Sequence, residues 1–134
     1  MKYLALLTLL VVSGYAFFTP EQHEIVKKLS IRCMEEIGEG LPENIGERFR
    51  GGDLTLNDAK SKCYMKCIFT KVGFISDTGD VNREVLVEKL SIGNTRERAE
   101  MFAERCSEFD GADACEISYG LYQCYHMNRD TFFS

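Results

Sequence analysis

Residues 63–67 read Cys-Tyr-Met-Lys-Cys and lie inside the segment Thr55–Val72, TLNDAKSKCYMKCIFTKV. At 100° per residue, apolar and cysteine side chains fall on two opposed arcs of a helix. One arc holds Leu56, Ala59, Cys63 and Cys67, and the other holds Met65, Ile68, Phe69 and Val72. A helix that is apolar on two sides is covered on both. This segment therefore predicts a central helix.

The N-terminal segment has the features of a secretory signal peptide in their usual order. Lys2 gives a positive start, residues 4–12 form an apolar core too short to span a bilayer, and Gly14 and Ala16 are small residues at a cleavage site. We predict that residues 1–16 are removed and that residues 17–134 form the working domain. The alternative, a buried N-terminal helix, is less favoured because charge, apolar run and small residues occur in order.

Composition limits the remaining classes. The chain has 134 residues, 45% of them apolar, and a net charge of −5, which fits one globular domain. It has no Lys/Arg-rich block for phosphate neutralisation, so a nucleic-acid partner is not expected. After residue 16 no apolar stretch approaches transmembrane length, so stable membrane insertion is not expected. Six cysteines, all beyond residue 16, predict three disulfides in an extracellular protein.

Capping and periodicity predict an all-α fold. Thr19-Pro20 is typical of a helix start, Gly38 and Gly40 of a helix end, and Thr55, Asp80 and Asn94 are expected N-caps. No segment has a convincing two-residue alternation between hairpin turns. The expected helices are about six short ones, at residues 20–37, 42–49, 55–72, 81–90, 95–109 and 112–127.

Helix geometry limits the disulfide pairing. Cys63 and Cys67 lie on one helical face with nearly parallel Cβ directions, so they are poor partners for each other. Cys115 and Cys124 lie on opposite faces of one expected helix, about 13.5 Å apart along its axis. Excluding both pairs leaves ten of the fifteen possible pairings.

The cysteine spacing, Cys33-x29-Cys63-x3-Cys67-x38-Cys106-x8-Cys115-x8-Cys124, resembles that of the insect odorant-binding proteins, the pheromone-binding and general odorant-binding family. The resemblance covers essentially all of residues 17–134, and Lys71-Val72-Gly73 also looks like the family. It implies a helical bundle around an apolar cavity for small hydrophobic ligands. It also implies the disulfides Cys33–Cys67, Cys63–Cys115 and Cys106–Cys124.

Helical spacing and the resemblance together predict the pocket residues, which share apolar side chains on inward stripes. Phe132 and Phe133 are included because two adjacent phenylalanines at a chain end can fold back as a lid. For any single residue, ordinary core packing is the competing interpretation. The predicted set is Val26, Leu29, Met65, Ile68, Phe69, Val72, Phe74, Leu86, Met101, Ile117, Leu121, Tyr122, Phe132 and Phe133.

Other chemistry has little support in the sequence. No nucleophile elbow, phosphate loop or His-Asp arrangement is present, so we expect no enzyme and no cofactor. A zinc site at Cys63 and Cys67 is disfavoured by the extracellular context, and residues 77–88 break the calcium-loop pattern, so no metal is expected. His126 is a candidate pH sensor for ligand release.

Two classes of function remain open. The first is a secreted carrier of small hydrophobic molecules such as odorants or pheromones, acting as a monomer or weak homodimer and reaching a membrane odorant receptor only indirectly. The second is a disulfide-stapled protein-interaction, defence or toxin-like module. A variant of the first class is a carrier outside olfaction, in saliva, venom or reproductive fluid. Displacement of an apolar probe separates the first class from the second.

Overall fold

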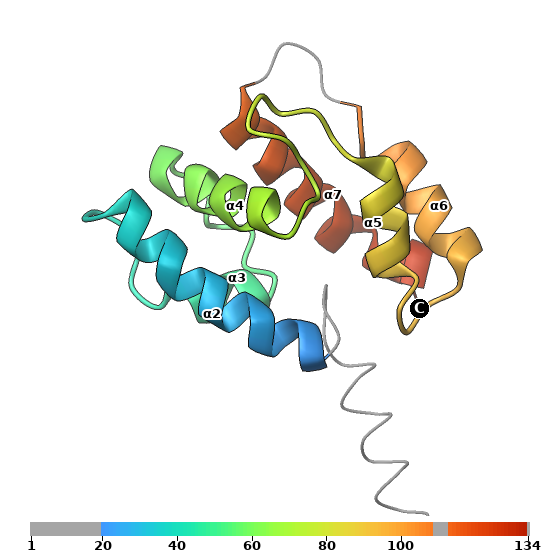
Figure 1. Ribbon diagram of the computed structural model, residues 1–134, viewed down its shortest axis with the longest axis horizontal. Coiled ribbons are helices and arrows are strands. Elements are labelled where there is room, and N and C mark those ends of the chain that lie inside the picture. The colour runs from blue at the N-terminus through green and yellow to red at the C-terminus, as the bar shows by residue number, and fades with distance from the viewer. Residues whose placement is uncertain (1–19, 109–112, 134) are drawn as a thin grey trace, which may run out of the picture.

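The computed structural model describes residues 20–108 and 113–133, with side chains described as far as residue 130. The predicted signal peptide, residues 1–16, lies outside these residues. The described chain forms six helices, which confirms the all-α class (Figure 1). They are α2 (Pro20–Ile37), α3 (Ile45–Arg50), α4 (Ala59–Lys71), α5 (Arg83–Leu90), α6 (Arg96–Arg105) and α7 (Ala114–Phe133).

The central helix α4 starts later than predicted. Its N-cap is Asp58, whose carboxylate accepts a hydrogen bond from the Ser61 amide at 3.1 Å. Thr55 does not cap α4, because its amide and hydroxyl both donate to the Asp53 carboxylate, at 2.9 and 2.5 Å. Local hydrogen bonds of this kind compete with capping. They hold Thr55 in the loop before the helix.

The predicted start of α5 is wrong for a similar reason. Asn82, and not Asp80, is the N-cap, accepting from the Val85 amide at 3.2 Å. The Asp80 amide donates to the Ser76 hydroxyl at 3.0 Å, and this turn is closed by an isolated antiparallel bridge between Ile75 and Val81. Asp80 is therefore used to build the turn that precedes the helix.

The remaining boundaries also differ from the predictions. Thr95 caps α6, while the Asn94 side chain donates to the Leu90 carbonyl at the end of α5, at 3.1 Å. The helix predicted to reach residue 109 ends at Arg105, and the last one continues to Phe133 instead of stopping near 127. The short helix α3 begins at Ile45 instead of Pro42.

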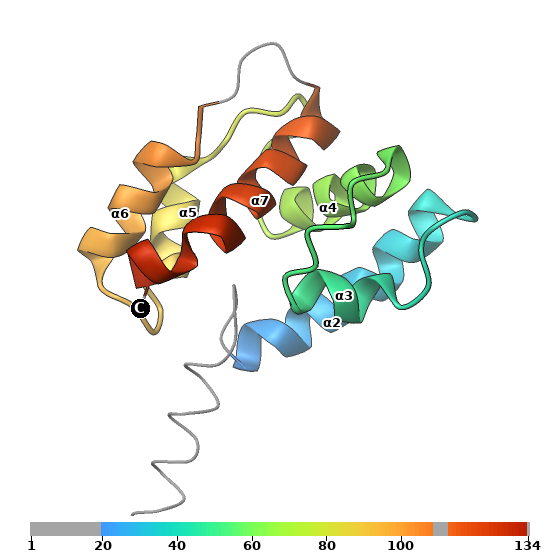
Figure 2. The ribbon, with the colours of Figure 1, turned by 180° about the vertical axis from the view of Figure 1, so that it is seen from behind.

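The helices are joined around α4. This helix packs against α7 on one side and α2 on the other, while α5 packs on α6 and α6 on α7. Figures 1 and 2 show α7 running across the back of the bundle, from α4 to α6. The Cys33–Cys67 disulfide joins α2 to α4, Cys63–Cys115 joins α4 to α7, and Cys106–Cys124 joins the end of α6 to α7.

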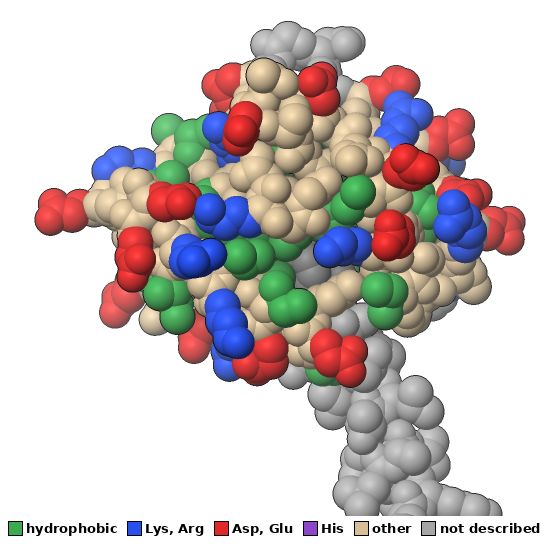
Figure 3. Space-filling view, viewed as in Figure 1, with side chains coloured by type: hydrophobic (Ala, Val, Ile, Leu, Met, Phe, Trp, Pro, Cys, Tyr) green, Lys and Arg blue, Asp and Glu red, His purple; other side chains and the backbone are tan. Residues whose placement is uncertain are grey.

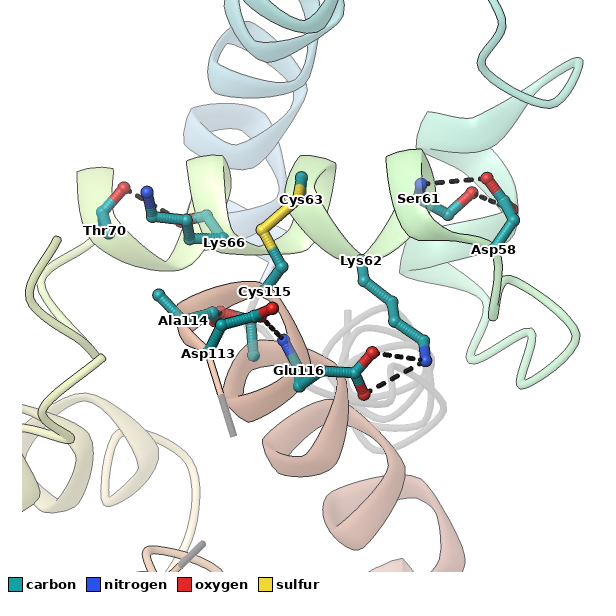
Figure 4. Close-up of a disulfide and its surroundings, with 11 residues drawn as sticks. Asp58, Ser61, Lys62, Cys63, Lys66, Thr70, Asp113, Ala114, Cys115 and Glu116 are labelled. Atoms are coloured by element: carbon teal, nitrogen blue, oxygen red, sulfur yellow. Dashed lines mark hydrogen bonds and ion pairs between the residues drawn. A yellow bond between two sulfur atoms is a disulfide. The ribbon is translucent and has the colours of Figure 1, made fainter. Parts of the chain in front are cut away.

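These are the three pairs that the family resemblance implies. The Cα–Cα distances are 5.7, 4.6 and 5.8 Å, all within the range of a disulfide. Figure 4 shows the second pair, with Cys63 on α4 facing Cys115 in the first turn of α7. Next to it the Lys62 ammonium and the Glu116 carboxylate form an ion pair at 2.9 Å. A disulfide and an ion pair therefore lie next to each other and both join α4 to α7.

The middle of the bundle is filled by aromatic side chains. The Phe49 ring stacks on Tyr122 with centroids 5.0 Å apart, and it meets Tyr64 and Phe69 at 5.8 Å each. All four side chains are buried. Aromatic pairs at such distances contribute about 0.5–1.5 kcal/mol beyond their burial. The centre among α3, α4 and α7 is thus a packed core.

Candidate ligand-binding site

A cleft lies at the edge of the bundle, where the first half of α2 meets the end of α4 and the last turn of α5. It is narrow: its cavity volume is about 40 Å³, and the space between atoms reaches about 340 Å³ only when the open solvent at its mouth is counted. Figure 3 shows hydrophobic side chains gathered in the middle of this face, with basic side chains on both sides of them. The lining residues are Gln22, Ile25, Val26, Val72, Phe74, Lys89 and Leu90.

The floor and the rim of the cleft differ in exposure. Val26, Phe74 and Leu90 form the floor, with only 1–3% of their surface exposed. Ile25, one residue before Val26 on α2, is 57% exposed at the mouth. An apolar rim over an apolar floor is the form of a site that gains free energy when a hydrophobic molecule covers it.

The end of α4 explains how two lining residues reach the cleft. Gly73 has φ of +87°, which side-chain-bearing residues rarely adopt. This turn lets the Phe74 amide donate to the Phe69 carbonyl at 2.9 Å, closing the helix. Val72, just before the turn, and Phe74, just after it, both line the cleft. The Phe74 ring also rests on Phe69, with centroids 5.7 Å apart.

One polar contact spans the cleft from α2 to α5. The Gln22 side-chain amide donates to the Lys89 backbone carbonyl at 3.4 Å, across 67 residues of sequence. Lys89 is also the single charged residue of the seven lining ones. The cleft can therefore hold an apolar body and offers polar groups at its edge.

The structure divides the predicted pocket residues. Val26, Val72 and Phe74 line the cleft. Six others lie in the packed core with at most 1% of their surface exposed, namely Met65, Ile68, Phe69, Leu86, Leu121 and Tyr122. Leu29 is half-buried on α2, and Ile117 is buried against the turn at Gly79, where an added Cβ would lie 2.9 Å from its Cδ1. The predicted inward stripes are thus mostly core.

Met101 does not face inward. It is 43% exposed, which corrects its placement among the pocket residues. The helix α6 packs on its neighbours through Ala99, Phe102 and Ala103, and Met101 lies outside that stripe. The side chains of Phe132 and Phe133 lie outside the described residues, so the lid remains a prediction. Deletion of residues 130–134 with unaltered ligand affinity would argue against it.

Sequence reasoning missed four lining residues: Gln22, Ile25, Lys89 and Leu90. The first two carried a usable signal, because Gln22, Ile25, Val26 and Leu29 follow the i, i+3, i+4, i+7 spacing of one helical face. Lys89 and Leu90 carried no such signal in the sequence. They reach the cleft only because α5 folds back beside α2, which periodicity within α5 does not reveal.

His126 is half-buried on α7 beside aromatic rings. Its ring centroid lies 4.5 Å from Tyr122 and 5.1 Å from Tyr125, and a Cβ at Gly52 would approach its Nδ1 to 2.8 Å. Burial, with a smaller effect of Arg129, lowers the pKa of His126 to about 4. The imidazole is therefore neutral between pH 7.5 and 5, which argues against the predicted sensor role in that range.

Two tyrosines of α7 bind the loop between α3 and α4. The Tyr122 hydroxyl donates to the Phe49 carbonyl at 2.8 Å, and the Tyr119 hydroxyl donates to the Leu54 carbonyl at 3.0 Å. Burial raises the pKa of Tyr122 well above its usual value. Both hydroxyls thus satisfy backbone carbonyls, so neither is the ligand hydrogen-bond donor that a pocket tyrosine would supply.

Among the described side chains, one group resembles a metal site in composition. The Cys33 and Cys67 sulfurs and the Glu36 carboxylate lie within 4.8 Å of one another. Both sulfurs are bonded in the disulfide, so neither is a thiolate ligand. Glu36 instead pairs with Lys71 at 3.0 Å. The group is a structural junction between α2 and α4.

No helix within the described residues is both long enough and apolar enough to cross a membrane. The described fold is a helical bundle closed by three disulfides, with an apolar cleft at one edge. This combination is that of a small-molecule binding protein.

A profile of the PBP/GOBP family matches residues 15–128, and the chain belongs to this family. It is 28% identical to general odorant-binding protein 56a of Drosophila melanogaster over 121 residues, which is 90% of this chain and 85% of that protein. It is 27% identical to odorant-binding protein 10 of Aedes aegypti over 105 residues, 78% of this chain and 73% of that protein. The predicted resemblance is confirmed.

A solved structure shows the same fold. The fatty acid binding protein OBP56a from the oral disk of the blowfly Phormia regina superposes with a TM-score of 0.69 at 27% identity. The match covers 85% of this chain and 96% of that protein. Secretion behind a signal peptide and ligand carriage without catalysis are typical of this family.

Proposed function

We propose that this protein is a secreted carrier that holds a small hydrophobic molecule in the cleft among α2, α4 and α5. It moves that molecule through an aqueous fluid without a covalent step. The main support is the cleft itself, in which five apolar side chains from three parts of the chain surround one space. One of them, Ile25, is 57% exposed at the mouth of the cleft. A bound apolar molecule would cover this surface.

The frame around the cleft supports a carrier. Two disulfides hold α4 between α2 and α7, so Val26 and Phe74 lie on the cross-linked part of the fold, while α5, which supplies Leu90, has no cysteine. A narrow site can then widen by a small movement of α5. This fits reversible binding of ligands with more than one shape.

The relatives support the same class of ligand. One carries the name of a fatty acid binding protein from an oral disk, and others are named odorant-binding proteins. We infer a small apolar or amphipathic ligand here, and secretion after removal of residues 1–16. A carrier in the olfactory system and one in another fluid share this chemistry. Expression in antennae against other tissues separates them.

Direct binding tests the proposal. Titration with the fluorescent apolar probe N-phenyl-1-naphthylamine should give saturable binding that C10–C18 compounds displace. Val72→Trp fills the cleft and should weaken probe binding at least tenfold. Ile92→Trp is the matched control, because Ile92 is 52% exposed and is not a lining residue. Equal binding by both variants would place the ligand elsewhere.

A protein-interaction or defence module is not favoured, given membership of a carrier family. Failure of every C10–C18 compound to compete with the probe would revive it. Mass spectrometry of the molecule that copurifies from native tissue would identify the natural ligand.

A further inference from the structure

We propose that the cleft is selective for amphiphiles with a carboxylate head, and that the Lys89 ammonium pairs with that head at the mouth. The apolar tail lies over Val26, Phe74 and Leu90. This rests on the carrier function proposed above and specifies the ligand that it carries.

The position of Lys89 is the first argument. It lies in the last turn of α5, next to Leu90, which forms part of the floor with 3% of its surface exposed. Its backbone carbonyl accepts the Gln22 amide, so this turn is held at the edge of the cleft. Lys89 itself is only half-buried. A lysine so placed covers apolar surface with its stem and keeps its ammonium near water.

The charge pattern is the second argument. Among the described residues, ion pairs engage the basic side chains of Lys27, Arg48, Lys62, Lys71, Arg83 and Arg96. Lys89 takes part in none of them. The seven lining residues include this lysine and no aspartate or glutamate. No carboxylate among the lining residues therefore balances the charge of Lys89, and this favours a ligand that carries an anionic group.

The arrangement also suits the energetics of an ionised head. A carboxylate placed deep among Val26 and Phe74 would lose its hydration at large cost. At the mouth it keeps contact with water while the tail is buried. Hydrogen bonds between an ammonium and a carboxylate are stronger than neutral ones. We expect this contact to favour an acid over the alcohol of equal chain length by about five- to tenfold.

The test compares dodecanoate with dodecanol as competitors of N-phenyl-1-naphthylamine at pH 7.5 in low salt. The wild-type protein should bind dodecanoate five- to tenfold more tightly, and 0.5 M NaCl should reduce that preference. Lys89→Met should lose the preference for dodecanoate over dodecanol. Lys89→Glu should prefer dodecylamine over dodecanoate.

Lys66→Met is the matched control, because Lys66 is also half-buried but lies on α4 away from the lining. It should keep the full preference for dodecanoate. Equal wild-type affinity for acid and alcohol, or equal loss in both lysine variants, would overturn the proposal. If the probe and both C12 compounds fail to bind the wild-type protein, the carrier function itself fails. A circular dichroism spectrum of Lys89→Met that matches the wild-type spectrum shows that the variant is folded.

Discussion

The centre of the bundle and the cleft at its edge are built from similar residues and behave differently. Around Phe49 the rings of Tyr64, Phe69 and Tyr122 meet within 5.8 Å, and two disulfides tie α4 to the helices on either side. At the cleft, α2 and α5 are bridged by one long hydrogen bond from Gln22. The described part of this fold has a packed centre and an open cleft at one edge.

The disulfides should give the largest effect. Replacing Cys63 and Cys115 together by serine removes a link across 52 residues and should cost about 4 kcal/mol of unfolding free energy, because the unfolded chain gains freedom. The Cys106 and Cys124 pair spans 18 residues and should cost about 3 kcal/mol. Urea unfolding followed by circular dichroism measures both.

Reduction of all three bonds should also weaken binding of an apolar probe. The bonds hold α2, α4 and α7 in place around the cleft floor. Unchanged affinity and helicity in the reduced protein would show that packing alone maintains the site.

A truncation in each region separates stability from binding. Phe49→Ala empties the centre and should cost about 3–5 kcal/mol of unfolding free energy. Ile25→Ala changes a rim residue that is 57% exposed, so stability should move by less than about 0.5 kcal/mol while probe affinity falls. Ile92→Ala, another exposed isoleucine, should change neither quantity. A loss of stability in Ile25→Ala equal to that in Phe49→Ala would erase the distinction.

The half-buried histidine beside the centre makes the fold sensitive to acid. The folded-state pKa of His126, about 4, is below the ordinary value of 6.5. Protonation therefore favours the unfolded chain, and stability should fall as the pH drops from 6.5 to 4, by an upper limit of about 3 kcal/mol. Urea midpoints at several pH values measure this loss.

His126→Gln should flatten this profile. His23→Gln is a comparison variant, because burial lowers the pKa of His23 on α2 as well and part of the loss in acid is expected from that residue. Probe affinity should stay constant from pH 7.5 to 5, because His126 remains neutral there. A release of probe in that range which His126→Gln abolishes would restore the sensor hypothesis.

A smaller loss of stability is expected for the Tyr122 hydroxyl. Tyr122→Phe removes one donor from the Phe49 carbonyl, which keeps the Gly52 amide at 3.2 Å, and should cost about 0.5–1.5 kcal/mol. Tyr119→Phe removes a similar contact to Leu54 from a half-buried tyrosine and should cost less. Thermal unfolding measures both. Equal losses would mean that burial of the carbonyl does not matter.

The all-α class was predictable because helix formation depends on residues that are close together in the sequence. The spacing of apolar residues in 63–72 and the glycine after Val72 predict a central helix that ends where the structure ends it, to within a residue. Helix starts were less predictable. Thr55 and Asp80 have the chemistry of N-caps, yet the Thr55 hydroxyl donates to Asp53 and the Asp80 carboxylate accepts from the Thr78 hydroxyl. Several oxygens compete for few amides, and tertiary position selects among them.

The ligand site was predictable only in part. Val26 and Val72 were found from helical stripes and Phe74 from its place after the central helix, but similar stripes in α4 and α7 supplied Phe69 and Leu121, which are core. Periodicity identifies a buried face and does not distinguish a packed neighbour from an open cleft. Gln22 and Lys89 meet across 67 residues, and no local pattern carries that information.

The local sequence therefore sufficed to predict the all-α class, to exclude two cysteine pairs and, through the cysteine spacing, to indicate the family. These depend on the helical repeat and on intervals along one chain. Which apolar stripe stays open was decided by the folding of α5 beside α2, because the free energy of burial depends on what arrives from elsewhere in the chain. The cleft with Lys89 at its mouth is a product of that long-range contact.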